Sequence, residues 1–476
     1  MFDILTSVFS GCFSILSKLL TLLFGGSKHT KGYTAQFAKE TSLLSYWNKG
    51  FCLTGYRKLT RTDSFKNALI VGGSGSGKSQ SVLIPDILTT NASIVVNDVS
   101  GELFAKTSGA LRARGYDVKV LHFSNPEISA GFNPVQLADT SSQIHKLASM
   151  LARTAHSGAK ADPFWESQSA SLIAVFIGIL KTQSREYQHI RNVLLLINRM
   201  TEKTHEGKSN SVDLLFTRYA SEELYSEYKT FLAYDDKLLT SIVASAKSAL
   251  SIFNDAAVAR VTSENTIDFA DVRKRKTAIF IQNSVVDQQY FSTISAIFFE
   301  SLVGYILSRF PKDGEMDIHL LLDEFSALGR IPVMPAAFAN VRKHNAAIMA
   351  VVQSTSQLES AYGKNDAGAI QSNCFAKVFF GGAPVDETKK LEQTLGLCSY
   401  TTADGRSETR PLLTSDEIRM LKPNRALIIA GMHPPILAKM HPAYTSRLYA
   451  SCLKLPPAVL TGEVPATVPL LQLNRV

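Results

Sequence analysis

The 476-residue sequence has few cysteines, and they are scattered along the chain. None shows C-x-x-C spacing or a nearby histidine; they are Cys12, Cys52, Cys374, Cys398 and Cys452. This pattern argues against a zinc site and against a disulfide framework, and it favours a reducing, cytoplasmic environment. The sequence also has no evident internal repeat, and its last twenty residues contain no acidic tail.

Charged residues make up only 19% of the chain, against 45% hydrophobic residues. Such a composition can bury a sizeable core, and the length suggests two or three folded units. Fifty Lys and Arg against 41 Asp and Glu leave a formal charge of +9. This excess favours a polyanionic partner, such as nucleic acid or an anionic membrane surface. The short basic run 273–276 could contact DNA phosphates or form a solvated face.

The first residues are mostly apolar from Phe2 to Phe24, about the length that crosses a hydrocarbon layer. On a helical wheel the polar residues share one narrow face: Asp3, Thr6, Ser7, Ser10, Ser14, Ser17, Lys18 and Thr21. Such a helix could lie in the membrane interface, span the membrane with its hydroxyls packed on other helices, or dock on the protein's own core. A secretory signal peptide is disfavoured, because no positive charge precedes the apolar segment.

We therefore predict that residues 1–27 form an amphipathic membrane-anchor helix. Residues 28–66 are predicted to be a basic linker and lead-in. The basic residues Lys28, Lys31 and Lys39 favour a cytoplasmic continuation of the chain after the anchor.

A glycine-rich run follows an apolar stretch at 68–71 and precedes a predicted helix. The run matches G-x-x-x-x-G-K-[ST], and its residues are Gly72, Gly73, Ser74, Gly75, Ser76, Gly77, Lys78 and Ser79. Glycines let backbone N–H groups wrap a triphosphate, Lys78 reaches the β- and γ-phosphates, and the Ser79 hydroxyl completes a Mg²⁺ shell. With Gln80, which comes next, this run is predicted to bind ATP and Mg²⁺. A flexible Gly/Ser turn is the alternative, and the Lys-Ser ending disfavours it.

Strands are predicted to alternate with helices on both sides of a long helical region. The predicted strands are 68–71, 93–98, 118–121, 277–281, 318–322, 347–352 and 376–380. This alternation predicts an α/β fold with a doubly wound, mainly parallel sheet. Residues 143–254 show helical periodicity alone, which predicts an inserted all-α domain. We expect core segments at 67–136 and 261–455, the all-α insertion at 137–260, and an extended or loosely docked tail at 456–476.

Two acidic residues follow the predicted strand 318–322. Asp323 could hold Mg²⁺ through water and Glu324 could polarise the attacking water, unless both are ordinary acidic loop residues. Gln353 ends the next strand, where an amide could sense the γ-phosphate or simply be a polar strand end. Arg342 lies between these strands, and it could stabilise a transition state in a neighbouring subunit or be a solvated helix residue.

With these residues in place, the chain resembles the type IV secretion coupling proteins, the TraG-like conjugative DNA-transfer ATPases, over most of 45–450. The segments that carry the resemblance, besides the glycine-rich loop, are Leu83-Ile84-Pro85, Asn133-Pro134, Asp162-Pro163-Phe164-Trp165-Glu166, Leu321-Leu322-Asp323-Glu324-Phe325 with Leu328-Gly329, Gln353-Ser354 with Gln357-Leu358, and Tyr362-Gly363.

The resemblance implies a RecA-like P-loop ATPase core with an inserted all-α domain. It also implies a homo-hexameric ring around single-stranded DNA at the cytoplasmic face of the bacterial inner membrane. Relaxosome or effector proteins and components of the type IV secretion channel are the implied partners. The family pattern places the nucleotide lysine at Lys78, the acidic pair at Asp323 and Glu324, the sensor glutamine at Gln353 and an arginine finger at Arg342.

Two features depart from that family. Residues 98–102 read Asp-Val-Ser-Gly-Glu where the family usually has Asp-x-Lys-Gly-Glu, so Ser100 replaces a lysine. A single amphipathic segment also replaces the usual pair of spanning helices, which predicts weaker anchoring or dependence on a membrane partner. A DNA-translocating ATPase is the leading hypothesis, and a nucleotide-bound receptor for effector proteins with little turnover is the alternative. A septal chromosome translocase is disfavoured, because the short tail leaves no room for a winged-helix domain.

Overall fold

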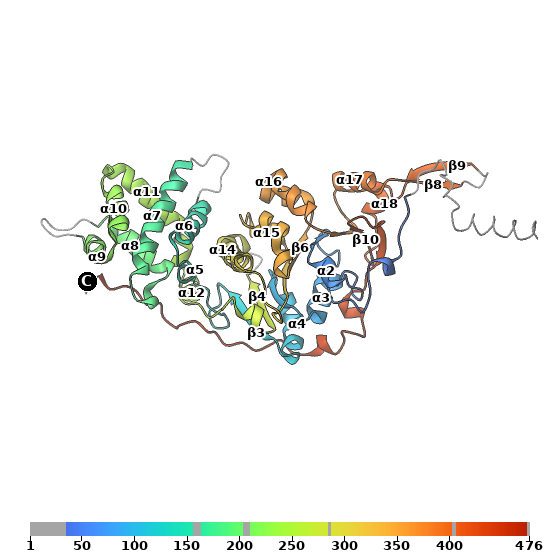
Figure 1. The fold of residues 1–476 in the computed structure, drawn as a ribbon, viewed down its shortest axis with the longest axis horizontal. Helices are drawn as coiled ribbons and strands as arrows, with labels where there is room; N and C mark the ends of the chain where they lie inside the picture. The colour runs from blue at the N-terminus through green and yellow to red at the C-terminus, as the bar shows by residue number, and fades with distance from the viewer. Residues whose placement is uncertain (1–34, 156–162, 203–209, 284–286, 402–405, 474–476) are drawn as a thin grey trace, which may run out of the picture.

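The computed structural model describes residues 35–155, 163–202, 210–283, 287–401 and 406–473. The predicted anchor at 1–27 lies outside the described residues. In Figure 1 a bundle of helices occupies one end of the molecule, a sheet flanked by helices occupies the centre, and C-terminal elements occupy the other end.

A nine-stranded mixed sheet forms the centre, in the order β11-β10-β7-β1-β6-β5-β2-β4-β3. Its strands are β1 (Ala68–Val71), β2 (Ser93–Asn97), β3 (Asp117–His122), β4 (Thr277–Gln282), β5 (Ile318–Leu322), β6 (Ala346–Val352), β7 (Ala376–Phe380), β10 (Arg425–Ala430) and β11 (Ile436–Lys439). All pairs from β7 to β3 are parallel, while β10 runs antiparallel to both β7 and β11. The predicted α/β fold with a mainly parallel sheet is thus confirmed, and sequence reasoning missed β10 and β11.

Helices cover both faces of this sheet, because alternate residues of its strands are apolar and buried on opposite sides. Leu69 and Val71 of β1 belong to one core cluster, and Ala68 and Ile70 belong to the other. The helical elements that connect or follow the strands of this part of the chain are α2 (Arg61–Ser64), η2 (Ser79–Leu83), α3 (Ile84–Thr89), α4 (Glu102–Ala113), α13 (Asp271–Lys274), α14 (Gln288–Ser308), η5 (Phe325–Leu328), α15 (Met334–Asn340), η6 (Val341–His344), α16 (Thr355–Ser372), α17 (Val385–Leu395) and α18 (Ser415–Arg419).

Between β3 and β4 the described chain is helical. The elements are α5 (Pro134–Leu137), α6 (Ser141–Ala155), α7 (Pro163–Lys181), η3 (Arg185–Tyr187), α8 (Ile190–Met200), α9 (Ser211–Tyr219), α10 (Glu222–Leu232), α11 (Asp236–Ala249), η4 (Ser251–Asn254) and α12 (Ala256–Val261). The apolar face of α7 is fully buried, and it comprises Leu172, Ile173, Phe176, Ile177 and Leu180.

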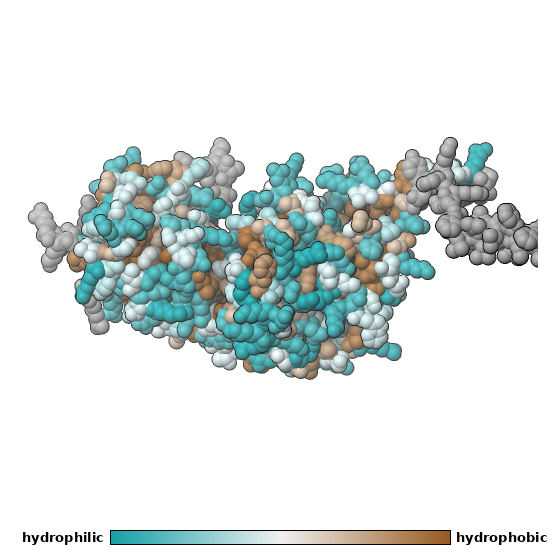
Figure 2. Space-filling view, viewed as in Figure 1, coloured by the Kyte–Doolittle hydropathy of each residue, from teal (hydrophilic) through white to brown (hydrophobic). Residues whose placement is uncertain are grey.

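Two of the helices, α7 and α14, are long and apolar enough to cross a membrane by length and composition. More than half of each apolar window is buried inside the protein, as in the core helices of soluble folds. Figure 2 shows hydrophobic side chains gathered around α14, where the helical bundle meets the sheet.

Segments outside these layers are also packed. In the lead-in, which includes η1 (Glu40–Ser42), Phe51, Leu53 and Leu59 are fully buried in the core. The C-terminal part contains a hairpin of β8 (Leu397–Thr401) and β9 (Ser407–Pro411), then η7 (Ala443–Thr445) and η8 (Cys452–Lys454). The chain then runs without helix or strand along the molecule to the helical bundle (Figure 1), where Leu471 donates its N–H to the Asn192 side chain at 3.1 Å.

The basic run 273–276 is largely structural. Arg273 is only 3% exposed, and its guanidinium donates to the carbonyls of Met316 and Asn345. Arg275 forms ion pairs with Asp117 and Asp271 at 3.0 and 2.7 Å. Lys274 lies 3.6 Å from Asp268, and the Lys276 ammonium lies 5.8 Å from the centre of the Tyr116 ring. All four cations therefore have partners within the chain, which favours the structural interpretation of this run over contact with DNA.

Candidate functional site

The predicted site residues gather at one edge of the sheet because β1, β6 and β5 are parallel neighbours. The glycine-rich loop follows β1, the acidic pair follows β5, and Gln353 follows β6. Parallel strands end at the same edge, which is where open α/β sheets bind their ligands. A hollow of about 1210 Å³ opens there, lined by Ser74, Gly75, Ser76, Gly77, Lys78, Ser79, Gln80, Val99, Ser100, Glu102, Asp323, Glu324, Ser326, Ala327, Gly329, Gln353, Gln357, Ser360 and Ala361.

The loop after β1 needs its glycines at specific positions. Gly75 and Gly77 have φ values of 73° and 93°, in the left-handed region that favours glycine. A Cβ at Gly72 would lie 2.7 Å from the Ser76 hydroxyl oxygen and 2.8 Å from Cβ of Phe380, so any side chain there would clash. Ser79 then begins the helical turn η2, which is continuous with α3. This is the strand, loop and helix context in which the motif binds phosphates.

Lys78 bends back over its own loop. Its ammonium donates to the carbonyl oxygens of Gly72 and Gly73, and the side chain is largely buried. Burial lowers the pKa of Lys78, while the carboxylates of Glu324 and Asp323 act in the opposite direction. Gly72 and Gly73 thus contribute to the site through their carbonyls, although neither lines the hollow itself.

The acidic pair is tightly placed. Burial, together with the neighbouring charge of Glu324, raises the pKa of Asp323 to about 7. Glu324 has a positive φ of 49°, which is unusual for a residue with a side chain. This conformation turns the Glu324 carboxylate toward Gln353, whose Nε2 lies 3.1 and 3.3 Å from its two oxygens. The Gln357 Nε2 in turn donates to the Gln353 Oε1 at 3.4 Å, so the two amides form a hydrogen-bonded series that ends at the Glu324 carboxylate.

The segment after β2 completes the hollow. Asp98 is buried and accepts hydrogen bonds from the N–H groups of Leu103 and Phe104, and burial raises its pKa to about 6. This anchors the start of α4 and places Ser100, where the resemblance expects a lysine, on the wall of the hollow. Gln80 donates to Glu102 at 2.7 Å across the hollow. Sequence reasoning missed Glu102 and Gln357 as lining residues; their positions just after β2 and β6 were the available signal.

Arg342 does not lie near the residues that line this hollow. It lies in η6, immediately before β6, whereas Gln353 lies immediately after β6. The seven residues of β6 separate the two positions by about 20 Å at the usual rise per strand residue. Arg342 instead lines a second hollow, of about 430 Å³, at the opposite edge of the sheet.

Comparison with known proteins identifies the family. The sequence model described as "Type IV secretory system Conjugative DNA transfer" matches residues 34–461. The chain belongs to this family. The resemblance drawn from its motifs is therefore confirmed: it is a member of the type IV secretion coupling proteins of conjugative DNA transfer.

Its similarity to individual members is distant but extensive. It is 25% identical to protein VirD4 of Agrobacterium fabrum over 413 residues, which is 80% of this chain and 59% of that protein. It is 22% identical to the conjugal transfer protein TraG of Escherichia coli over 418 residues, which is 76% of this chain and 62% of that protein. The chain thus spans about three-fifths of the length of these curated relatives.

Solved structures share the fold. The bacterial conjugative coupling protein TrwBdeltaN70 superposes with a TM-score of 0.66 and 17% identity, covering 93% of this chain and 98% of that one. The plasmid coupling protein TrwB in complex with ADP and Mg²⁺ superposes with a TM-score of 0.65 and 16% identity, covering 93% and 99%.

Proposed function

We propose that this protein is an ATP-hydrolysing coupling protein of a type IV secretion or conjugation system. It recruits relaxase-bound single-stranded DNA, effector proteins or both, and drives their transfer to the secretion channel. The observation that carries this proposal is one hollow in which the Lys78 loop, the Asp323–Glu324 pair and Gln353 converge from three neighbouring strands.

The residues of the hollow fit ATP with Mg²⁺. The loop from Gly72 to Ser79 offers backbone N–H groups at the start of a helix, and Lys78 offers an ammonium that lines the hollow. Ser79 and Asp323 would hold Mg²⁺, a hard cation that prefers oxygen ligands and phosphates. The related protein TrwB, whose fold is shared, was solved with ADP and Mg²⁺, which supports this assignment.

Hydrolysis requires a group that takes a proton from water. We assign this role to Glu324, whose carboxylate lies in the hollow beside Lys78 and Asp323. The Gln353 amide donates to the Glu324 carboxylate and holds it in one orientation. With nucleotide bound, Mg²⁺ and Lys78 supply positive charge to the transferring phosphoryl group.

The remaining elements of the proposal concern assembly and partners. Arg342 faces away from its own chain's hollow, so its proposed role as an arginine finger requires a neighbouring subunit. We propose a homo-hexameric ring at the cytoplasmic face of the bacterial inner membrane, with residues 1–27 as the anchor. The net charge of +9 agrees with a polyanionic cargo. The RecA-like core, the all-α insertion and its boundaries at 137–260 are part of this proposal.

ATP hydrolysis by the full chain in detergent, with and without single-stranded DNA, tests the function. Lys78→Ala is the matched blank. We expect DNA to stimulate hydrolysis severalfold, and we expect the stimulation to vanish in the variant. Binding of ATP with negligible hydrolysis under all conditions would favour the alternative, a nucleotide-bound receptor for effector proteins. Undiminished hydrolysis by Lys78→Ala would remove the proposed site altogether.

A further inference from the structure

Two surface segments that are far apart in the sequence meet and expose aromatic side chains. In the first segment Trp47 is 91% exposed and Tyr46 is 53% exposed. The centre of the Tyr56 ring lies 6.3 Å from that of Tyr46 and 6.5 Å from that of Tyr449, which joins the first segment to a second one around η7. We give the name Trp47 patch to the surface formed by Tyr46, Trp47, Lys49, Arg57, Tyr444 (70% exposed) and Leu448 (60% exposed).

The turn that contains Trp47 is held in a fixed position. Ser45 and Lys58 exchange two backbone hydrogen bonds, at 3.0 and 2.9 Å. The Asn48 side chain donates to the Lys58 carbonyl at 3.0 Å, and the Trp47 N–H donates to the Ser45 hydroxyl oxygen at 3.3 Å. A large apolar side chain is normally buried, and a group of them held in solvent by a preformed turn is typical of a surface that binds a partner.

The sequence around the Trp47 patch has charges of one sign. Residues 41–60 and 418–462 contain no aspartate or glutamate. Their cations are Lys49, Arg57 and Lys58 in the first range and Lys422, Arg425, Lys439, Arg447 and Lys454 in the second. Glu40, just before the first range, pairs with Arg57 at 3.4 Å, so the other cations set the charge of this surface. Cations grouped around exposed aromatic side chains attract an anionic surface.

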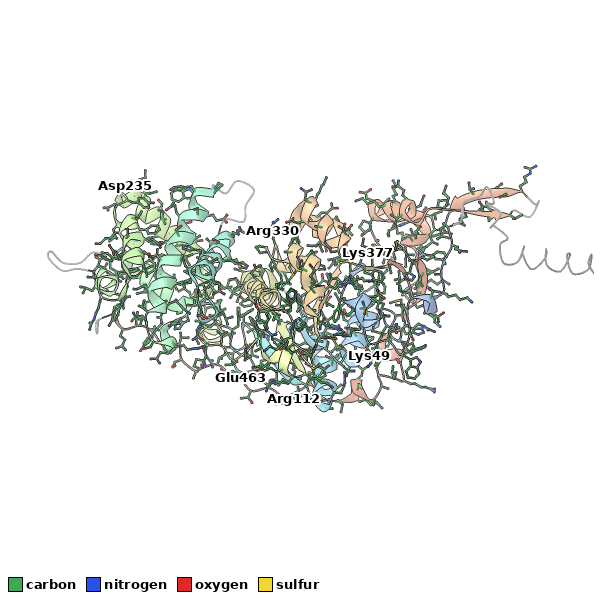
Figure 3. All side chains as sticks on the ribbon, viewed as in Figure 1. Lys49, Arg112, Asp235, Arg330, Lys377 and Glu463 are labelled. Carbon is green, nitrogen blue, oxygen red and sulfur yellow. The ribbon has the colours of Figure 1, made fainter. Side chains whose placement is uncertain are left out.

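The position of the patch favours a lipid surface over nucleic acid. The described chain begins at Ala35, whose N–H donates to the Leu397 carbonyl at 3.2 Å, and Glu40 soon after accepts the N–H of Lys439 at 2.8 Å. The chain from the end of the proposed anchor, residue 27, to residue 40 extends over at most about 45 Å, so the patch is within reach of the same membrane. Figure 1 shows the described chain beginning at the end of the molecule opposite the helical bundle, and Figure 3 labels Lys49 well away from that bundle.

We propose that the Trp47 patch lies against an anionic lipid membrane, with its aromatic side chains among the headgroups and its cations beside lipid phosphates. Tryptophan and tyrosine favour this interface because their rings are apolar at one end and polar at the other. Each lysine or arginine held near an anionic surface strengthens the contact about fivefold.

The inference rests on the proposed place of this protein at the membrane, and it adds a contact on the folded core to the proposed anchor at 1–27. A single anchor helix followed by a linker leaves the core free to tilt. A second contact, made by a turn that is fixed to the core, sets the orientation of the sheet relative to the membrane.

The test uses Trp47 as the reporter in the full chain. The sequence has two tryptophans, so Trp165→Phe leaves Trp47 alone. This variant is reconstituted into vesicles of phosphatidylcholine, or of equimolar phosphatidylcholine and phosphatidylglycerol, with acyl chains brominated near the headgroup. In the anionic vesicles we expect the emission of Trp47 to shift to shorter wavelength and to be quenched about twofold or more by the brominated lipid. Trp47→Phe, which leaves only Trp165 of the helical bundle, is the control and should respond alike in both kinds of vesicle.

Charge reversal tests the cations of the patch. In the Trp165→Phe chain, Lys49→Glu or Arg447→Glu replaces an attraction by a repulsion and should lower the equilibrium constant for the contact roughly 25-fold. High salt should weaken the quenching in the same way, because it screens exposed charges. Lys237→Glu, on the exposed surface of α11 in the helical bundle, is the matched control and should leave the quenching unchanged.

Three results would overturn the proposal. Emission typical of water in both kinds of vesicle would mean that Trp47 does not touch lipid. Emission at short wavelength in detergent, without lipid, would mean that residues 1–27 or a second copy of the chain covers the patch. Quenching by single-stranded DNA in detergent, combined with no response to lipid, would assign the patch to nucleic acid.

Failure of the proposed anchor is recognised separately. The protein would then not float with phosphatidylcholine vesicles, whereas contact of Trp47 with anionic vesicles would still be seen. ATP hydrolysis does not enter the measurement, so the outcome is independent of the proposed ATPase activity.

Discussion

A buried carboxylate beneath the phosphate-loop helix makes the stability of this protein depend on pH. Asp86 of α3 is fully buried. One carboxylate oxygen accepts the N–H of Cys52 at 2.8 Å. The other has no hydrogen-bond partner among the residues that the structure describes, and it lies 4.0 Å from Nδ1 of buried His319. Burial raises the pKa of Asp86 to about 7 and lowers the pKa of His319 to about 4. Near pH 5 both side chains are therefore neutral.

The replacement Asp86→Asn keeps this neutral form at every pH. In the wild type, the folded-state pKa of Asp86 lies above the ordinary value of 3.8, so its contribution to stability is full below about pH 4 and is lost as pH rises through 7. Between pH 5 and pH 8 the ionisation of Asp86 lowers the free energy of unfolding of the wild type by the equivalent of about two pKa units, or about 3 kcal/mol. The depressed pKa of His319 acts with the opposite sign, and only as pH falls from 6.5 to 4. We expect the stability of Asp86→Asn relative to the wild type to be greater at pH 8 than at pH 5 by about 3 kcal/mol.

The measurement is urea unfolding of the full chain at pH 5 and pH 8, followed by far-ultraviolet circular dichroism and by the fluorescence of the two tryptophans. Other buried acids contribute to the pH dependence of both proteins, so the difference between variant and wild type isolates Asp86. The control is Asp313→Asn, which changes an exposed turn residue. An equal difference between Asp86→Asn and wild type at the two pH values would refute the reasoning, because it would mean that Asp86 ionises alike in the folded and unfolded chains.

Three further predictions follow from the site and the tail. Glu324→Gln is expected to bind ATP as tightly as the wild type and to lose about a thousandfold in kcat, measured by phosphate release and by equilibrium dialysis; hydrolysis within a factor of two of wild type would contradict the assignment of the base. Gln357→Ala frees the Gln353 amide and should lower kcat severalfold with little change in KM, whereas a raised KM alone would indicate a role in binding. Leu471→Ala removes a side chain that is 7% exposed in the docked tail and should cost about 2–3 kcal/mol in urea unfolding; no change would mean that the tail is free in solution.

Some elements of the fold could be predicted to the residue. The strands β1, β5 and β7 were predicted with the bounds that the structure has, because each is a mostly apolar run that ends at glycine or acidic residues. Strands that are buried on both faces produce such runs, so the run of apolar residues and the residues that end it are enough to predict the bounds of the strand. The helices from α5 to α12 begin earlier and end later than the periodic region, at Pro134 and Val261, because short helices such as α5 and α12 have too few turns to show periodicity.

Other elements depend on contacts that no local pattern contains. β10 and β11 form an antiparallel pair whose place beside β7 is set by partners far along the chain. The tail after residue 455 lacks helix and strand, yet it is fixed by single hydrogen bonds such as that from Gly462 to the Glu127 carbonyl, at 2.7 Å. The motifs located residues that converge on one hollow, but the left-handed Glu324, which turns its carboxylate toward Gln353, is visible only in three dimensions.

For Arg342, a short distance along the sequence is a poor guide to distance in the fold. It precedes β6 and Gln353 follows it, so a short stretch of sequence holds two residues of one predicted site. A strand is nearly fully extended, and it therefore sends these residues to opposite edges of the sheet, about 20 Å apart. The same geometry places Lys66 and Lys78 at opposite ends of β1. The sheet therefore keeps Arg342 away from the Lys78 loop of its own chain, so the arginine-finger role proposed for Arg342 requires a second copy of the chain.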